Sequence, residues 1–157
     1  MQSHLSNVDR LEIERACERL VYAYSRALDR GDMNAAADCF AVEATFARPM
    51  TPDILIRGRE AIRTALLSRP KTLLTKHVAS NVMIDVDTHD SAHGVSYLTM
   101  IATTPAAGAQ PPHASSGPMY FGEFLDRFVL EAGVWRFLER RGSIQLKFDH
   151  GLGRSAP

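Results

Sequence analysis

Residues 24–32 read YSRALDRGD, and this stretch joins the end of one helix to the start of another. Gly31 follows the last residue of a helical pattern, the position at which glycine commonly ends a helix. Asp32 precedes the next helical run and fits an N-cap. Asp29 lies in the last helical turn, where the helix dipole disfavours a carboxylate. We therefore expect Asp29 either to form an exposed ion pair with a neighbouring arginine or to face inward and hold a histidine.

The residues before this stretch predict a long amphipathic helix over residues 9–30. Asp9 fits its N-cap, and Glu12 fits the third position of a capping box. Apolar side chains recur three and four residues apart, which places them on one face that packs on a core. The members of this face are Ile13, Ala16, Cys17, Leu20, Val21, Tyr24, Ala27 and Leu28.

The residues after it predict short elements followed by long strands. Up to residue 70 we expect a helix at 33–40, a strand at 42–47, a turn at 50–53, a strand at 54–57, and a helix that Gly58 opens and Pro70 stops. From Thr75 the apolar period changes to two, which is typical of strands. The strands lie at 75–86, 94–104, 119–130 and 134–148, with a hairpin turn at 88–91 and a bulge or bend at residues 142 and 143.

Helices grouped before a run of antiparallel strands indicate an α+β fold. We expect the N-terminal helices to lie across one side of a curved, mostly antiparallel sheet, which leaves a cone with an open mouth and a pocket for a small molecule. The segment 104–117, TPAAGAQPPHASSG, is predicted to be a flexible hairpin loop. The length fits a single domain over residues 1–157, with its core at about 9–148 and a tail at 149–157.

The composition is that of an ordinary globular protein. Of the 157 residues, 45% are hydrophobic and 23% charged, and 18 basic residues balance 18 acidic ones, so neither nucleic acid nor an anionic membrane is expected as the main partner. Cys17 and Cys39 fall at apolar helical positions and are expected to be free, buried thiols, and their spacing does not suggest zinc. The polar N-terminus does not resemble a signal peptide and no apolar run would span a bilayer, so we expect a cytoplasmic protein.

Among the six histidines, His77 is the candidate for chemistry. It begins the segment KHVASNVMID beside apolar residues, where a buried core histidine is the ordinary alternative. In a regular strand Asn81 would share its face. The apolar face that Val82 and Ile84 define has the opposite parity, so either a bulge turns His77 toward that face or His77 faces away from it.

Tyr24 is the third candidate, five residues before Asp29 on the apolar face of the first helix. Core packing is the ordinary reading of a tyrosine in this position. A buried tyrosine hydroxyl nevertheless needs a hydrogen-bond partner. In a pocket it could donate to a substrate carbonyl or protonate a leaving group.

The sequence resembles the SnoaL-like branch of the NTF2-like superfamily over about residues 9 to 148. The resemblance rests on YSRALDRGD, on the HxxxN of His77 and Asn81, and on GVWRF at residues 133–137. It implies a cone-shaped α+β barrel around a deep pocket. Within that branch the chain looks most like scytalone dehydratase, bile acid 7α-dehydratase and hexachlorocyclohexane dehydrochlorinase, which use an Asp-His dyad for elimination.

The resemblance implies that His77 is the catalytic base, that Asp29 orients it, and that Tyr24 matches a catalytic tyrosine of the bile acid enzyme. Two scytalone dehydratase residues are replaced, since Tyr97 lies near the place of its second pocket histidine and Phe124 near that of its pocket asparagine. We expect a mostly apolar pocket that binds a ring-containing substrate. The predicted substrate-binding residues are Tyr97, Phe46, Met83, Phe121 and Phe124.

These observations favour a cofactor-free lyase of the dehydratase type, with neither a metal nor a nucleotide. An isomerase or cyclase that uses the same pocket is the second reading, because proton abstraction can end without loss of water. A non-catalytic binding protein, or an accessory subunit such as the small subunit of a dioxygenase, is the third. A homo-oligomer, either a dimer or a trimer, is expected because an open sheet face with apolar residues usually needs a partner.

Overall fold

The computed structural model describes residues 5–115 and 117–149, so most of the predicted tail and His4 lie outside the described residues. Three helices and six strands make up this part of the chain. They are, in order, α1 (Asn7–Asp29), α2 (Met33–Asp38), β1 (Phe40–Arg48), β2 (Thr51–Arg57), α3 (Arg59–Leu67), β3 (Leu74–Val86), β4 (Ser91–Thr103), β5 (Met119–Glu131) and β6 (Val134–Phe148).

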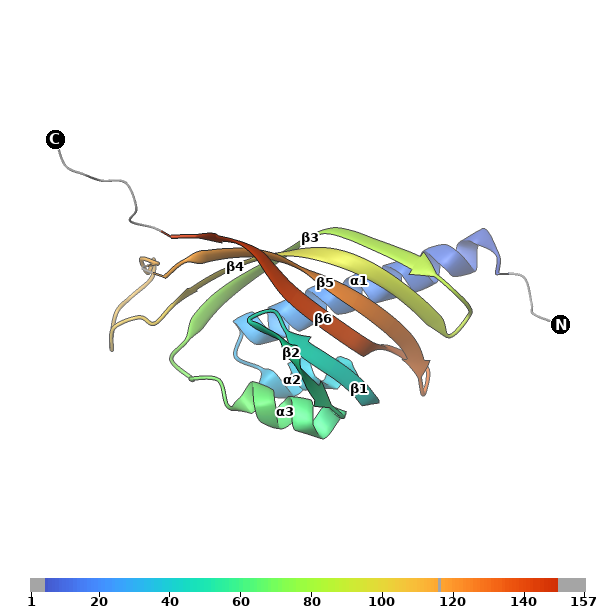
Figure 1. Cartoon of the computed structure of the whole chain (residues 1–157), viewed down its shortest axis with the longest axis horizontal. Coiled ribbons are helices and arrows are strands. Elements are labelled where there is room, and N and C mark those ends of the chain that lie inside the picture. Colours follow the sequence, from blue (N-terminus) through green and yellow to red (C-terminus); the bar gives the residue numbers. More distant parts are fainter. Residues whose placement is uncertain (1–4, 116, 150–157) are drawn as a thin grey trace.

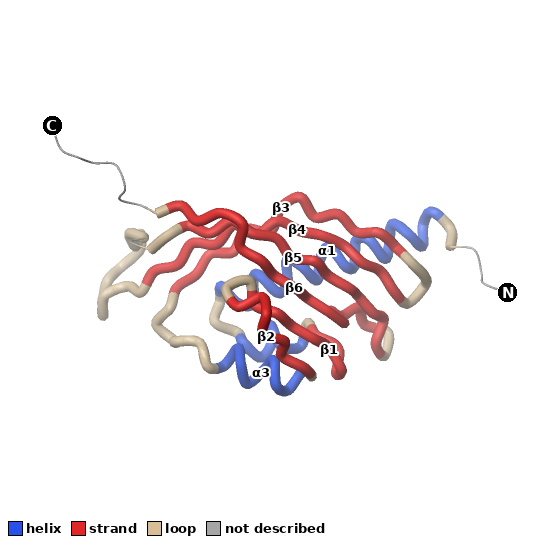
Figure 2. The backbone as a smooth tube through the Cα atoms, in the orientation of Figure 1, coloured by secondary structure: helices blue, strands red, loops and turns tan. Residues whose placement is uncertain are grey.

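The strands form one mixed, curved sheet in the order β2-β1-β6-β5-β4-β3. Every neighbouring pair is antiparallel except β1 and β6, which run parallel. Because β2 and β3 are free edges, the sheet is open, and the barrel implied by the resemblance is not closed. The three helices lie on one side of it, with α1 running along the sheet and α3 beside β1 and β2 (Figure 1, Figure 2). The α+β class predicted from the order of elements is confirmed.

Helix α1 begins earlier than its sequence pattern predicts. Its N-cap is Ser6, whose hydroxyl accepts a hydrogen bond from the backbone N–H of Asp9, while the Asp9 carboxylate accepts the N–H of Ser6. Asp9 is therefore the third residue of the capping box instead of the N-cap, and Glu12 has no part in it. The apolar face packs on the core as predicted, with Cys17 and Val21 fully buried.

The junction after α1 follows the prediction. Gly31 has a positive φ of 72°, and the Asp32 side chain accepts the N–H of Ala35 at the start of α2. Two later boundaries were predicted wrongly. Helix α2 ends at Asp38 and β1 already begins at Phe40, and β2 begins at Thr51, where a turn was expected. Pro52 is tolerated there because β2 is an edge strand with one side unpaired.

The core between α1 and the sheet is rich in aromatic rings. The ring centroid of Tyr24 lies 5.6 Å from that of Phe40 and 5.9 Å from that of Phe137, both in edge-to-face geometry. Phe46 lies 5.2 Å from Phe40 on the same strand. Such pairs contribute about 0.5–1.5 kcal/mol each beyond the area that they bury. The cluster fixes the end of α1 against β1 and β6.

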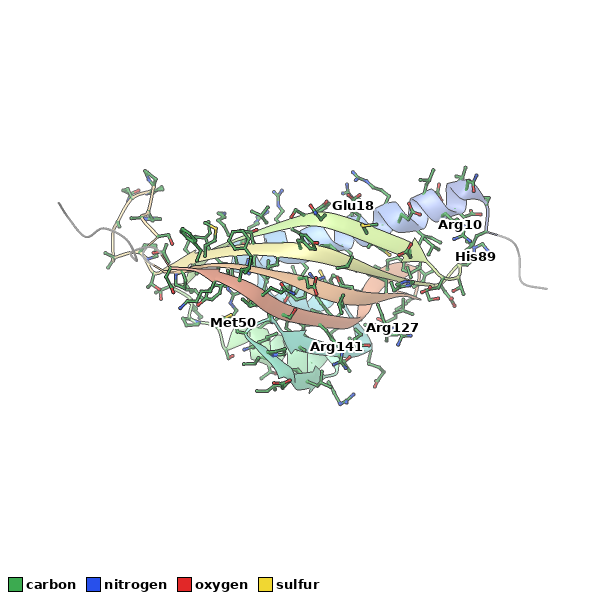
Figure 3. The ribbon with its side chains drawn as sticks, turned by 45° about the horizontal axis from the view of Figure 1, so that its top comes forward. Arg10, Glu18, Met50, His89, Arg127 and Arg141 are labelled. Atoms are coloured by element: carbon green, nitrogen blue, oxygen red, sulfur yellow. The ribbon has the colours of Figure 1, made fainter. Side chains whose placement is uncertain are left out.

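The two ends of the sheet differ. Figure 3 shows Arg10 near the start of α1 and His89 in the β3–β4 turn at one end of the molecule, and the β4–β5 loop projects from the other. The Arg10 guanidinium donates to the backbone carbonyl of Val86, which ties α1 to the end of β3. No helix in the described part of the chain is long and apolar enough to cross a bilayer.

Candidate functional site

Asp29 and His77 form a hydrogen-bonded pair where the end of α1 meets β3. Oδ1 of Asp29 lies 2.5 Å from Nδ1 of His77, and the two side chains are only 12% and 8% exposed. The same carboxylate accepts the backbone N–H of His77 at 2.9 Å and the hydroxyl of Thr75 at 3.2 Å. Asp29 thus also satisfies an open N–H of edge strand β3, a structural role that the sequence pattern did not reveal.

The surroundings of Asp29 keep its carboxylate charged. Burial raises its pKa, but the side-chain and backbone hydrogen bonds from His77, the charge of that imidazole and the Thr75 hydroxyl together hold the pKa of Asp29 below its ordinary value. A carboxylate that accepts from Nδ1 keeps the proton on that nitrogen. Nε2 of His77 is then the atom that can take up a proton from a ligand.

A bulge in β3 turns His77 toward the helices. The pairing with β4 shifts between Ser80 and Met83, and Asn81 has a positive φ of 48°. Before the bulge the odd-numbered residues face the core side, and after it the even-numbered Val82 and Ile84 pack there. Of the two alternatives that the parity of His77 left open, the structure shows the bulge. It also leaves Asn81 exposed, so Asn81 does not share the face of His77.

His77 lines an interior pocket of about 290 Å³. The pocket lies between α1, the β1–β2 turn, the end of α3 and the first half of β3. Its wall is mostly apolar, with polar groups from Ser25, Thr51, Thr75 and the candidate residues and two charged side chains, Arg48 and Arg69. The lining residues are Tyr24, Ser25, Leu28, Phe46, Arg48, Pro49, Met50, Thr51, Leu66, Arg69, Leu73, Thr75, His77, Leu98, Met100, Ala102, Phe124 and Ile144.

The Asp29–His77 pair also borders an open outer groove between α1 and the edge of β3. This groove has a volume of about 530 Å³ and is lined by polar and basic side chains, among them Arg26, Arg30 and Lys76. Tyr24 does not reach it. Only the interior pocket therefore brings His77 and Tyr24 to a common space, and it is the better candidate for a site of chemistry.

Tyr24 is buried at the wall of this interior pocket. Burial raises the pKa of its hydroxyl to about 12, against the opposing effect of the positive charges of Arg140, Arg69 and Arg48. The hydroxyl is therefore protonated at neutral pH and is a potential hydrogen-bond or proton donor.

The predicted lining residues divide into two groups. Phe46 and Phe124 line the interior pocket, as expected. Met83, Tyr97 and Phe121 lie on the opposite face of the sheet, where they are 66%, 51% and 38% exposed. Their predicted placement in the pocket was wrong, because successive side chains of a strand point to opposite faces and these three have the outward parity.

Arg140 is a buried charge that the sequence analysis did not single out. Its Cζ lies 3.8 Å from the ring centroid of Phe124 and 4.8 Å from that of Tyr24, and its side chain is 1% exposed. Nη1 donates to Oδ2 of Asp126 at 2.9 Å. Burial raises the pKa of Asp126, while the charge of Arg140 lowers it. In the sequence this arginine stands beside the exposed Arg141, and only the register of β6 tells them apart.

The described residues contain no group of three or more His, Cys, Asp or Glu side chains that could hold a metal ion. His93 forms a second pair with a carboxylate, Nδ1 to Oδ1 of Asp87 at 2.9 Å. That pair lies on the surface, with side chains 55% and 46% exposed. It resembles the Asp29–His77 pair in chemistry but does not line the interior pocket.

Comparison with known proteins relates the chain to one family. The model of the SnoaL-like domain family matches residues 9–141. No curated protein matches the sequence. A scytalone dehydratase-like protein of Novosphingobium aromaticivorans DSM 12444 has a solved structure that is 23% identical and superposes with a TM-score of 0.77 over 97% of each chain.

Two further structures are similar. Hexachlorocyclohexane dehydrochlorinase LinA-type3 of Novosphingobium barchaimii LL02 is 15% identical, with a TM-score of 0.74 over 97% of this chain and 99% of that one. A protein of unknown function from Mycobacterium tuberculosis is 25% identical, with a TM-score of 0.68 over 89% of this chain and 76% of that one. These likenesses establish a shared fold.

Proposed function

The chain belongs to the SnoaL-like domain family, and from this premise we propose that it is a cofactor-free lyase. The reaction is a dehydratase-like elimination on an apolar, ring-containing small molecule. One observation carries the proposal: a histidine held at Nδ1 by a largely buried carboxylate, 2.5 Å away, lines a mostly apolar pocket that Tyr24 also lines.

In the proposed reaction His77 is the general base. Nε2 accepts a proton from a carbon that is activated by a neighbouring carbonyl group. The electron pair of the broken C–H bond forms the new double bond, and the bond to the leaving hydroxyl group breaks. Tyr24 gives its proton to the departing hydroxide, which leaves as water. The proton now on His77 returns through solvent to the Tyr24 oxygen and restores both groups.

Electrostatics favour this assignment of roles. The lowered pKa of Asp29 means that a full negative charge faces the imidazole, which stabilises its protonated form during the reaction. The raised pKa of Tyr24 keeps its hydroxyl a donor. Arg140 lies against the ring of Tyr24 and lowers the cost of transient negative charge on its oxygen, a positioning role because its guanidinium does not line the pocket.

The proposal is tested with a panel of hydroxylated cyclic ketones and mass spectrometry of the products. Loss of one water molecule from a panel member, in the wild type and not in His77→Ala, supports the lyase. The surface variant His93→Ala is the matched control and should retain full conversion. A product of unchanged mass would instead indicate an isomerase, and binding without conversion would indicate a non-catalytic binding protein.

A further inference from the structure

The interior pocket is positively charged as well as apolar. Its charged lining residues are Arg48 and Arg69, and no aspartate or glutamate lines it. Asp29 lies behind His77, on the side of the outer groove. A ligand in the pocket therefore meets two guanidinium groups within a largely apolar wall.

Arg69 is the less satisfied of the two. It lies just after α3, is half-buried, and its polar side-chain contact among the described residues is Nη2 to the hydroxyl of Thr75, at 3.5 Å. A guanidinium has five N–H donors, so most of its donors have no acceptor within the described part of the chain. Arg48, in contrast, donates to the backbone carbonyl of Ala65 at the end of α3.

Two other arginines that pack into the protein have carboxylate partners. Arg140 is bonded to Asp126, and Arg59 is bonded to Glu131. Arg69 forms no ion pair of this kind within the described part of the chain.

Burial lowers the pKa of Arg69, as does the charge of Arg48, while the charges of Tyr24 and Asp29 oppose this shift. A buried charge is ordinarily paired or bound to a ligand. An anion that enters the pocket would satisfy the free donors of Arg69.

We propose that Arg69 binds a carboxylate of the ligand, so that the pocket takes a small apolar ring compound that carries a carboxylate group. The fork of the guanidinium matches the two oxygens of a carboxylate. A volume of about 290 Å³ holds a bicyclic ring against Phe46, Leu98 and Phe124. Identification of this ligand as the substrate rests on the proposed function, whereas the binding preference does not.

The site also couples the ligand to the catalytic pair. The hydroxyl of Thr75 contacts Arg69 on one side and donates to Oδ1 of Asp29 on the other. A carboxylate held by Arg69 would fix the ring at one end, within the pocket that His77 lines. Arg69 would thus determine both the choice of ligand and its position relative to Nε2 of His77.

Calorimetric titration with 2-naphthoate and its neutral analogue 2-naphthamide tests the proposal. We expect the wild type to bind the naphthoate on the order of tenfold more tightly, because the guanidinium can form an ion pair with two parallel hydrogen bonds to the carboxylate but only hydrogen bonds to the neutral amide oxygen. Arg69→Met should remove this preference. Arg57→Met, which removes an exposed arginine of β2, is the matched control and should retain it.

Equal affinity for the two probes in the wild type, or a preference that survives in Arg69→Met, would overturn the proposal. A crystal structure of the wild type with 2-naphthoate provides the same test if the variant does not fold, since a carboxylate placed away from Arg69 contradicts it. His77→Ala should keep the preference. If the lyase assay fails but the wild type still prefers 2-naphthoate to 2-naphthamide, the proposed function is wrong and the proposed carboxylate site at Arg69 is not.

Discussion

At the scale of single residues, Asp29 serves the fold and the site together. One carboxylate accepts the backbone N–H of His77, the Nδ1 proton of the same residue and the hydroxyl of Thr75. The first of these bonds ties the end of α1 to an edge strand, and the second holds the imidazole of His77, the proposed base. A substitution at Asp29 should therefore alter both stability and turnover.

The pH dependence of stability should reveal the charge on Asp29. Because its pKa is lower in the folded chain than in the unfolded chain, Asp29 stabilises the fold above its ordinary pKa of about 4 and loses this contribution as the pH falls. Urea denaturation at several pH values should show the wild type losing stability below about pH 4 more steeply than Asp29→Asn. Asp53→Asn, on the exposed start of β2, is the control. An equal gap between wild type and Asp29→Asn at every pH would contradict this.

The buried pair of Asp126 and Arg140 allows a second test at this scale. Both side chains are 1% exposed, so removal of one partner leaves an uncompensated charge. Asp126→Ala should lower the free energy of unfolding by about 3–5 kcal/mol. The double variant Asp126→Leu with Arg140→Met should recover most of this loss. If the single and double variants are equally unstable, the charge is not the cause.

The partly exposed pair of Glu139 and Arg141, which flank Arg140 on strand β6, serves as the control for that cycle. Glu139→Gln should change the free energy of unfolding by about 1 kcal/mol or less, because solvent screens such pairs. A loss as large as that of Asp126→Ala would show that the method does not separate buried from exposed charges.

At the scale of elements, the bulge in β3 decides which residues meet. Without the extra residue, His77 and the apolar run from Val82 to Val86 could not face the same side. Asn81 adopts the left-handed conformation that the bulge requires, and its side chain is exposed. The bulge is therefore a backbone feature that determines which way the side chain of His77 points.

The effect of a substitution at Asn81 on the free energy of unfolding should depend on whether the new residue tolerates a positive φ, because the Asn81 side chain itself is exposed. Asn81→Val should lower the free energy of unfolding by about 1–2 kcal/mol, since a β-branched residue is strained at positive φ. Asn81→Gly should cost nothing or stabilise the fold slightly. Guanidinium denaturation of both variants measures this. A valine variant as stable as the glycine variant would contradict the assigned conformation.

At the scale of the whole molecule, a row of three apolar side chains and one threonine crosses the outer face of the sheet. Val78, Thr99, Phe121 and Leu146 are paired side by side on four neighbouring strands. Val78 and Leu146 are 57% and 65% exposed. We expect a second copy of the chain to cover this row, because such patches on a soluble protein usually mark an interface.

Light scattering during gel filtration tests this expectation. The wild type should have a mass that is a multiple of the 17.4 kDa chain, and Leu146→Glu should lower it. Ile54→Glu places the same charge at a similarly exposed residue of β2 and should leave the mass unchanged. A monomeric wild type would rule out the interface.

The sequence pattern predicts the fold better than it predicts the lining of the pocket. The order of elements and the junction at Gly31 and Asp32 follow from local rules of capping and periodicity. The parity of His77 allowed a bulge in β3 but did not decide for it. The face to which Met83, Tyr97 and Phe121 point depends on strand register, which one irregular residue reverses. The buried position of Arg140 could not be predicted for the same reason. Two adjacent arginines indicate a surface, and only the register of β6 shows which of them points inward.

The central claim is that His77, held by Asp29, is the base of an elimination reaction. The most direct test is kcat/KM for His77→Ala, measured on the panel compound that the wild type converts, with circular dichroism as a check on folding. The account predicts a loss of about 10²–10⁴-fold, while His93→Ala, which removes the surface histidine paired with Asp87, stays at the wild-type value. A folded His77→Ala variant with wild-type kcat/KM would contradict it.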